Sequence, residues 1–238
     1  MEMLPEKWSA AMNPELGKIF RLQHDLRDTI ARIYSEQGIA EKQPKEPTIF
    51  HEMIKSDLSE EDKKPRRLGD EAQTVIGAGL STTAWALSCA SFYVINNPPV
   101  LAKLRKELFA AIPDIHAPDA FAFSKVETLE YLRGVVREGI RLSHGVTARI
   151  PRIMTHPVAF QDWTIPPLTP VSMTVMDVHF DPEIYPEPLV FKPERWLGNP
   201  KAPDGESMEK YWVAFGKGTR MCLGMQYVNA LLVRSDFR

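Results

Sequence analysis

The sequence predicts a mainly α-helical protein with a small β region in its carboxyl-terminal half. Up to residue 143, apolar side chains recur every three or four positions, the spacing of amphipathic helices. Beyond it, short apolar runs alternate with proline turns, and 11 of the 20 prolines lie between residues 151 and 203. From residue 221 onward the helical pattern resumes.

The composition is that of a globular protein. Of the 238 residues, 44% are hydrophobic and 25% are charged, which are ordinary values for a folded domain. The 29 basic and 31 acidic residues nearly balance, so we expect no nucleic-acid partner. Two cysteines, Cys89 and Cys222, are too few for a disulfide framework and too distant for a Cys-x-x-Cys metal site. Cys89 has no motif around it and is expected in the core.

Residues 1–67 are expected to form the helices that precede a long central helix. An apolar stripe predicts an amphipathic helix over residues 15–34. A shorter helix is expected over residues 48–55. Residues 56–67 are dense in charge of both signs, which is typical of a solvated loop.

The central helix is expected over residues 68–97, capped by Asp70 and ended by prolines. Residues 75–95 carry no charge, which also makes this segment a candidate membrane span. Gly, Ser and Thr are frequent there and bulky aliphatic residues are sparse. The favoured interpretation is therefore a helix buried on all sides in a globular core, and a single-span membrane protein is the alternative.

Residues 98–143 are predicted to form two more helices, over residues 99–112 and 125–142. Residues 144–203 are predicted to hold short strands and then, from residue 179, a proline-rich meander. The strands are expected over residues 150–155, 158–160, 163–165 and 171–175. Residues 204–238 close the chain with a glycine-rich loop and a helix.

Cys222 lies in that glycine-rich loop, directly before the last helical pattern. The N–H groups at a helix amino terminus favour the thiolate form of such a cysteine, and Lys217 and Arg220 act in the same direction. Gly218 and Gly224 allow left-handed backbone and close approach. A thiolate in this setting is a good ligand for a soft metal, haem iron included. The alternative is a small buried hydrophobic residue, the common state of a free cysteine.

The spacing Phe-x-x-Gly-x-Arg-x-Cys-x-Gly, from Phe215 to Gly224, resembles the cysteine-loop signature of the cytochrome P450 family. Three further segments match motifs of this family, in the order that the family uses. They are similar to its oxygen-binding helix, its Glu-x-x-Arg pair and its meander motif. The matching residues are Ala78-Gly79-Leu80-Ser81-Thr82-Thr83, Glu138 with Arg141, and Phe191-Lys192-Pro193-Glu194-Arg195-Trp196.

The resemblance implies Cys222 as the axial ligand of the iron in haem b. The residues that it implies around this cofactor are Arg220, Phe215, Gly218, Gly224 and Arg149. The two arginines would bind the propionates, and the phenylalanine would limit water near the sulfur. For His179 an exposed loop histidine is the favoured interpretation, and a contact with a propionate is the alternative.

On the oxygen-binding helix, the resemblance implies Thr82 as the residue whose hydroxyl lies above the iron. Ser81 and Thr83 are possible members of a proton relay. Family members usually carry Asp or Glu at the position of Ser81, so proton delivery here is expected to pass through water and hydroxyl groups.

The resemblance also implies a buried structural triad of Glu138, Arg141 and Arg195, which would hold the meander behind the cysteine loop. The first two, three residues apart on a helix, share a face. A buried charge needs such partners, so loss of one member is expected to be strongly destabilising.

The four motifs extend from Ala78 to Gly224, so the chain resembles the carboxyl-terminal half of a family member, and residues 211–228 are similar to filamentous-fungal enzymes. The amino-terminal helices, the main-sheet strands and the closing β hairpins are expected to be missing. The implied activity is a haem-dependent monooxygenase of fungal secondary metabolism that inserts one atom of O2 into an apolar small molecule. Electrons would come from NADPH through a separate flavoprotein reductase.

A second hypothesis is a truncated, haem-free and inactive fragment, or an interaction module that associates through unburied apolar surface of the central helix. The amino terminus shows no signal-peptide pattern. Full-length relatives are typically anchored to the endoplasmic reticulum membrane, whereas this chain is expected in the cytoplasm or at a membrane surface. Of the segments that determine specificity in the family, residues 146–153 and those flanking Thr82 are present.

Overall fold

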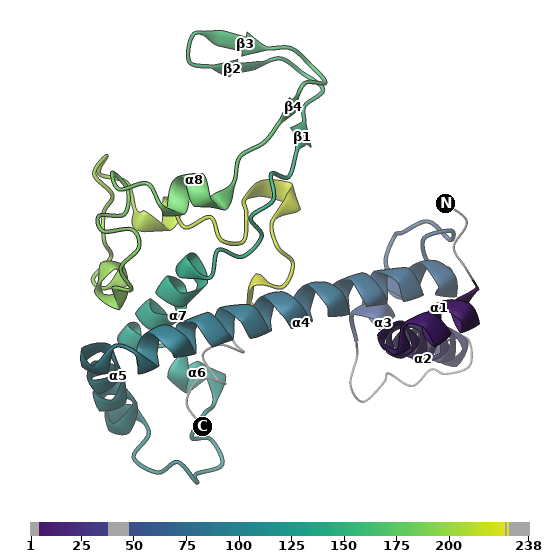
Figure 1. The fold of residues 1–238 in the computed structure, drawn as a ribbon, viewed down its shortest axis with the longest axis horizontal. Coiled ribbons are helices and arrows are strands. Elements are labelled where there is room, and N and C mark those ends of the chain that lie inside the picture. Colours follow the sequence, from purple (N-terminus) through teal and green to yellow (C-terminus); the bar gives the residue numbers. More distant parts are fainter. Residues whose placement is uncertain (1–4, 38–47, 227, 229–238) are drawn as a thin grey trace. The chain divides into compact units, whose positions relative to one another are not determined.

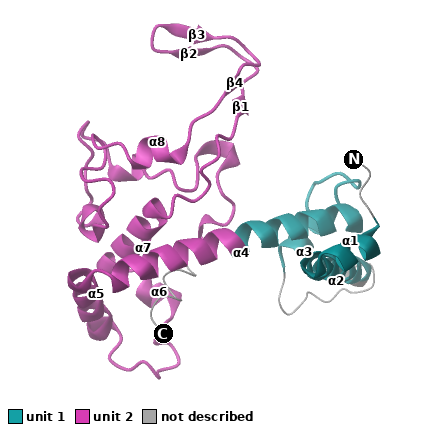
Figure 2. Ribbon diagram, viewed as in Figure 1, with its two compact units in different colours: residues 1–80 teal, residues 81–238 magenta. Residues whose placement is uncertain are grey.

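The computed structural model describes residues 5–37, 48–226 and 228, and it is mainly helical, as predicted (Figure 1). The β structure of this part of the chain consists of two small antiparallel sheets and one isolated bridge. The chain divides into two compact units, with the border directly after Leu80, inside helix α4 (Pro65–Ile95) (Figure 2). One partial domain over residues 1–238 stays a prediction.

The first unit is a small helical cluster. Its helices before α4 are α1 (Glu6–Met12), α2 (Pro14–Gln37) and α3 (Ile49–Lys55), and the latter two cover the helices predicted for this region. The buried apolar side chains come from α2 and from the first turns of α4, and they are Ile30, Leu68 and Ala72.

Helix α4 begins three residues earlier than predicted, at Pro65. Proline suits a first turn, because the N–H that it lacks would have no intrahelical partner there. The predicted cap, Asp70, therefore lies inside the helix, where its carboxylate is 3.7 Å from the guanidinium of Arg27. The charged residues 56–64 before the helix are mostly exposed, as expected of a solvated loop.

Most of α4 is exposed, so the prediction of a helix buried on all sides is wrong. Only 17% of its most apolar stretch is buried. In the second unit its buried positions are Ala86, Ala90 and Val94, which form one narrow stripe where another helix approaches. Leu80, at the end of the first unit, and Phe92, in the second, are exposed. By length and composition, α4 is the one helix among the described residues that could cross a membrane, a test that buried core helices also pass.

The second unit is built around α5 (Pro98–Ala111), α6 (Phe123–Val126) and α7 (Glu130–Leu142). Its main apolar core includes Leu104 and Leu132, both with no exposed surface. Helix α5 begins one residue earlier than predicted, with two prolines in its first turn and with the side chain of Asn97 accepting the N–H of Val100 at 3.4 Å.

The predicted helix over residues 125–142 is broken into α6 and α7. No side chain at the start of α7 caps its free N–H groups. Glu107 of α5 supplies the cap instead: its carboxylate accepts the N–H of Tyr131 at 2.8 Å and that of Leu132 at 2.9 Å. Because a carboxylate is favourable at a helix amino terminus, this contact both starts α7 and joins it to α5.

Two glycines let α7 approach its neighbours closely. A Cβ on Gly134 would lie 2.7 Å from the carbonyl oxygen of Pro193, and one on Gly139 would lie 2.6 Å from the Cβ of Ala90. Real Cβ atoms do not come so close to other heavy atoms. Glycine is therefore required where α7 meets the meander and where it crosses α4.

The β region follows α7 as predicted, but its strands are short. The two sheets are β1 (Arg152–Ile153) with β4 (Pro170–Val171), and β2 (Val158–Phe160) with β3 (Trp163–Ile165). The β2–β3 pair is a hairpin whose turn contains Gln161 in the left-handed region, at φ 51°.

The predicted strand over residues 171–175 ends at Val171. A short helix, α8 (Val175–His179), begins where the strand was expected to continue, because the hydroxyl of Thr174 accepts the N–H of Met176 at 3.0 Å and of Asp177 at 3.3 Å. The meander that follows has little regular structure, as predicted, apart from the 3₁₀ helix η1 (Pro193–Trp196).

Replacing Gly139 by alanine should lower the free energy of unfolding by about 1–3 kcal/mol, because the added methyl group overpacks the contact with Ala90. Urea denaturation measures this loss. Gly77→Ala is the matched control, since this helical glycine has no atom within 4 Å of the added Cβ. The control should be neutral or slightly stabilising, and equal losses in both variants would contradict the close approach of α7 to α4.

Candidate functional site

The carboxylate of Glu138 is the centre of a buried charge network. Glu138 and Arg141 have no exposed side-chain surface, and the Arg141 guanidinium binds both oxygens of the carboxylate, Nε to Oε2 at 2.9 Å and a terminal nitrogen to Oε1 at 2.8 Å. Three residues apart on α7, the two side chains share one face of the helix. Paired hydrogen bonds of this kind are the strong form of a salt bridge.

The meander supplies the other donors to this carboxylate. Oε1 of Glu138 accepts Nε of Arg195 at 2.9 Å and the backbone N–H of Lys192 at 3.2 Å, and Oε2 accepts the indole N–H of Trp196 at 2.9 Å. With the two bonds from Arg141, five donors reach one carboxylate. The structure thus brings together the three residues of the predicted triad, and adds Trp196 to them.

The two arginines also hold the backbone of the meander. Arg141 donates to the carbonyl of His179 at 2.7 Å, and Arg195 donates to the carbonyl of Pro186 at 3.1 Å and to that of Glu187 at 3.3 Å. Both guanidinium groups lie near the ring of Tyr185, at 5.1 and 6.0 Å from its centroid. The network therefore ties α7 to α8, to the meander and to η1.

His179 is not the exposed loop histidine that the sequence suggested, since only 2% of it is exposed. Its Nε2 accepts the backbone N–H of Val213 at 3.2 Å. Two neighbours account for this burial. The guanidinium of Arg141 binds the carbonyl of His179 at the end of α8, and the ring of Tyr185 packs edge-on against the imidazole, with 6.0 Å between the ring centroids. No sequence pattern marked this residue.

Backbone hydrogen bonds close the loop that carries Cys222. The N–H of Gly216 donates to the carbonyl of Val213 at 2.9 Å, and the N–H of Cys222 donates to that of Phe215 at 2.8 Å. The ring of Phe215 packs edge-on against Trp212 at 5.5 Å and against the main core. The side chain of Cys222 is exposed, so the alternative of a buried hydrophobic residue is wrong.

Two glycines bend this loop, and only one of them was among the glycines expected to do so. Gly216 and Gly218 have φ of 68° and 77°, in the left-handed region that favours glycine. Gly224 is outside this region, and a Cβ on it would lie at an ordinary 3.9 Å from Sγ of Cys222. Left-handed backbone was therefore predicted correctly for Gly218, wrongly for Gly224, and missed for Gly216.

The remaining predicted residues are not joined to these groups. Arg149 and Arg220 are exposed, and neither pairs with a carboxylate among the described residues. On α4, Ser81 and Thr82 are exposed, whereas the hydroxyl of Thr83 is buried without a hydrogen-bond partner in the described part of the chain.

Two further residues of α4 lie in this region: Trp85, which no sequence motif marked, and Cys89, which was expected in the core. The indole N–H of Trp85, one turn beyond Thr82 on α4, donates to the carbonyl of Ser143 at 2.7 Å and so joins α4 to the end of α7. Cys89 is partly buried, and this burial raises the pKa of its thiol.

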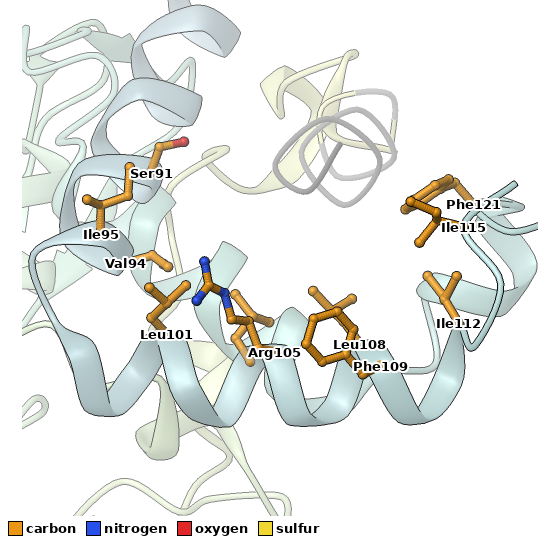
Figure 3. Close-up of a pocket in the computed structure, with 11 residues that line it drawn as sticks. Ser91, Val94, Ile95, Leu101, Arg105, Leu108, Phe109, Ile112, Ile115 and Phe121 are labelled. Carbon is orange, nitrogen blue, oxygen red and sulfur yellow. The ribbon is translucent and has the colours of Figure 1, made fainter.

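A cavity of about 310 Å³ lies between the end of α4, helix α5 and the segment that follows α5 (Figure 3). Its lining is mostly apolar, with Val94, Leu108 and Phe121 among the residues that face it and Arg105 as its charged member. None of the predicted site residues lines this cavity.

The structure thus defines a class of protein: a helical fold that presents a thiol on a glycine-bent loop and contains a buried Glu–Arg–Arg network. The model of the cytochrome P450 family matches residues 3–227. The chain belongs to the cytochrome P450 family. A crystal structure of a cytochrome P450 (CYP102L1) shares the fold with a TM-score of 0.69 at 23% identity, over 91% of this chain and 49% of that one.

Fungal proteins are among its similar sequences. It is 48% identical to cytochrome P450 monooxygenase sdnE of Sordaria araneosa, over 89% of this chain and 43% of that protein. It is 39% identical to monooxygenase tpcC of Cochliobolus heterostrophus, over 98% and 44%, and 34% identical to N-acetyltryptophan 6-hydroxylase ivoC of Emericella nidulans, over 95% and 44%. The chain spans less than half the length of these curated relatives.

Replacing Glu138 by glutamine should cost about 3–5 kcal/mol in the free energy of unfolding, because two buried guanidinium groups lose their counter-charge. Urea denaturation of the variant measures this loss. As a control, Glu15→Gln removes an exposed carboxylate from its pair with Lys18 and should leave the stability unchanged. A loss no larger than that of the control would contradict the burial of the network.

The protein should lose stability as the pH falls from about 6.5 to about 4. Burial, and next the guanidinium of Arg141, lowers the pKa of His179 from 6.5 to about 4, against the opposing charge of Glu138. Between these values the unfolded chain binds a proton that the folded chain does not. The contribution, about 3 kcal/mol, is therefore complete above pH 6.5 and is lost on the way to pH 4.

Urea denaturation at a series of pH values tests this expectation. In His179→Gln the part of the loss between pH 6.5 and 4 that belongs to this imidazole should disappear. An unchanged pH profile in the variant would show that His179 titrates normally in the folded chain.

Proposed function

We propose that the protein represented by this chain is a haem-dependent monooxygenase, which inserts one atom of O2 into an apolar organic molecule. In the balanced reaction, substrate, O2, two electrons and two protons give a hydroxylated product and water. The observation that carries the proposal is the exposed thiol of Cys222 on a loop closed by backbone hydrogen bonds and bound at Val213 by the buried His179.

The residues around Cys222 suit haem. A thiolate is a soft ligand for iron, and here the sulfur is not buried in the core but exposed on a loop with two left-handed glycines. Met221 and Leu223 on either side are exposed as well, at 46% and 80%. Apolar side chains next to an exposed thiol are what a large apolar cofactor would cover.

In this proposal, Sγ of Cys222 binds the iron of haem b, and the guanidinium groups of Arg220 and Arg149 bind its propionates. Phe215, packed on Trp212, excludes water from the side of the sulfur. The haem, when bound, supplies the activation of O2, which the thiolate promotes by donating electron density.

Hydroxyl groups on α4 would move the protons. Thr82 would hold a proton on Oγ1 toward the reacting O2, with Ser81 and Thr83 beside it. The Oγ1 of Thr83 is buried without a partner in the described residues, which leaves it open to a water molecule. With serine in place of a carboxylic residue at position 81, the relay would consist of hydroxyl groups and water.

The substrate class follows from the exposed side chains after α7 and from the relatives. Val146, Ile150 and Ile153 expose 50–60% of their surface in the segment that determines specificity in this family. They would form an apolar wall. Because the similar proteins are fungal monooxygenases, one of them named as a hydroxylase of an aromatic amino-acid derivative, we assign the reaction to fungal secondary metabolism.

Electrons would come from NADPH through a separate flavoprotein reductase that docks by charge near the cysteine loop. The positive charges near the loop are those of Lys210, Lys217 and Arg220. Of the two lysines, Lys217 is the stronger candidate, since among the described residues its ammonium donates only to the carbonyl of Glu209, at 3.3 Å. Lys210 lies within 4 Å of two carboxylates, those of Asp204 and Glu206, which offset its charge.

Lys217→Gln should slow reduction by the reductase severalfold at low salt and leave substrate binding unchanged, because surface charge acts on the rate of association. Stopped-flow reduction and substrate titration measure the two effects. Lys210→Gln is the comparison and should have the smaller effect. Equal reduction rates in the wild type and the two variants would contradict docking of the reductase on this surface.

The second candidate is a haem-free fragment that associates with a partner. The exposed apolar side chains of α4, such as Leu80 at 71% and Phe92 at 61%, favour it, because a single helix with such a face tends to be covered. A scaffold of this kind would keep its association when Cys222 is replaced, whereas a haem-thiolate enzyme would lose its activity.

Cys222→Ser should abolish the strongly red-shifted Soret band of the reduced, carbon-monoxide-treated protein, because a hydroxyl cannot replace the thiolate on iron. Cys89→Ser, the matched control, should keep the band. A wild-type protein without this band, in the presence of haem, would overturn the proposed function and leave the haem-free candidate.

A further inference from the structure

His179 connects the buried charge network to the cysteine loop through both its backbone and its ring. Its carbonyl accepts a terminal nitrogen of Arg141 at 2.7 Å, and its Nε2 accepts the N–H of Val213 at 3.2 Å. Only 2% of the residue is exposed, so water does not compete for either contact.

Backbone hydrogen bonds continue from Val213 to Cys222. The carbonyl of Val213 accepts the N–H of Gly216, which turns the chain in the left-handed region, and the carbonyl of Phe215 accepts the N–H of Cys222. The bond from His179 therefore fixes Val213, the first residue of a short turn that is closed by the N–H of Gly216. Cys222 is hydrogen-bonded to Phe215 of the same turn.

Among the described residues, His179 is the side chain that hydrogen-bonds to the backbone between Val213 and Cys222. Trp212, next to Val213, donates its backbone N–H to the carbonyl of Met208 at 3.2 Å. Its side chain is held by contacts with Phe215, Trp196 and the guanidinium of Arg137, and its indole N–H is buried without a partner in the described residues. Ring contacts tolerate sliding, whereas a hydrogen bond fixes a direction.

We infer that His179 is a positioning residue for the cysteine loop. Held by the Glu138–Arg141–Arg195 network, it fixes the position of the backbone that carries Cys222. The inference rests on the proposed function of Cys222 and adds to it the residue that holds the thiolate in place. Its side chain binds the backbone of Val213 and not the thiol, so it acts through Val213.

The bond also fixes the state of the imidazole. An Nε2 that accepts an N–H carries no proton, so the neutral ring must carry its proton on Nδ1. Around it lie the cation of Arg141, which disfavours a second proton, the carboxylate of Glu138, which favours one, and the ring of His144. This tautomer can be observed in the unmodified protein.

The first test is nuclear magnetic resonance of the labelled wild-type chain without haem. We expect the neutral Nδ1–H tautomer of His179 and a scalar coupling across the hydrogen bond from the Val213 N–H to Nε2. Absence of the coupling, or the opposite tautomer, would overturn the inference, and neither outcome depends on a variant that could fail to fold.

The second test compares amide hydrogen exchange in three variants. In His179→Leu the Val213 amide should exchange about fivefold to tenfold faster, the effect of one lost hydrogen bond, while the core amides of Val135 in α7 stay protected. His179→Gln offers an amide acceptor at the same position and should restore protection. His156→Leu, an exposed histidine, is the control. Unchanged exchange at Val213, or equal acceleration in α7, would contradict a positioning role.

The third test separates this inference from the proposed function. With haem bound, His179→Leu should show a smaller share of thiolate-ligated haem in the reduced carbon-monoxide spectrum, and His179→Gln should match the wild type. Equal shares in all variants would overturn the positioning role with the function intact. If the wild type binds no haem, the proposed function fails, and the amide exchange alone decides the contact of His179 with Val213.

Discussion

A single buried carboxylate sets the arrangement of the second unit. Glu138 has no exposed surface, and an isolated charge in that position would be prohibitively unfavourable, so every lone pair must be engaged. Five donors meet this demand, and they come from α7, from η1 and from the residue before η1. Segments without regular structure are thereby hydrogen-bonded to a helix, which explains how a proline-rich meander can have a fixed position.

Local patterns predicted the parts of the site that depend on neighbours in sequence. A glutamate and an arginine three residues apart on a helix share a face whatever surrounds them, and the glycines before Cys222 predict a bent loop. The roles of Trp196 and His179 could not be predicted in the same way. Each depends on groups from elsewhere in the chain, and a histidine among prolines carries no periodicity that would separate a buried ring from an exposed one.

The same distinction explains the errors in the fold. The charge-free stretch of α4 showed what the helix can bury, whereas its actual exposure depends on which elements lie against it, and α7 contacts only one stripe. The break between α6 and α7 follows from a carboxylate of α5, Glu107, and the early end of the strand at Val171 follows from the cap at Thr174. In both cases a side chain that accepts backbone N–H groups decided where the helix begins, and the apolar periodicity alone did not show it.

The separation in sequence between the two sides of the Glu138 network has a consequence for the order of folding. Arg141 emerges from the ribosome three residues after Glu138, whereas Lys192, Arg195 and Trp196 follow 54 to 58 residues later. Until then the carboxylate has one partner, and the later donors must close a long loop against chain entropy. Contacts of this range slow folding, so α7 should form early with its arginine, and the cysteine loop should be among the last segments to reach its final position.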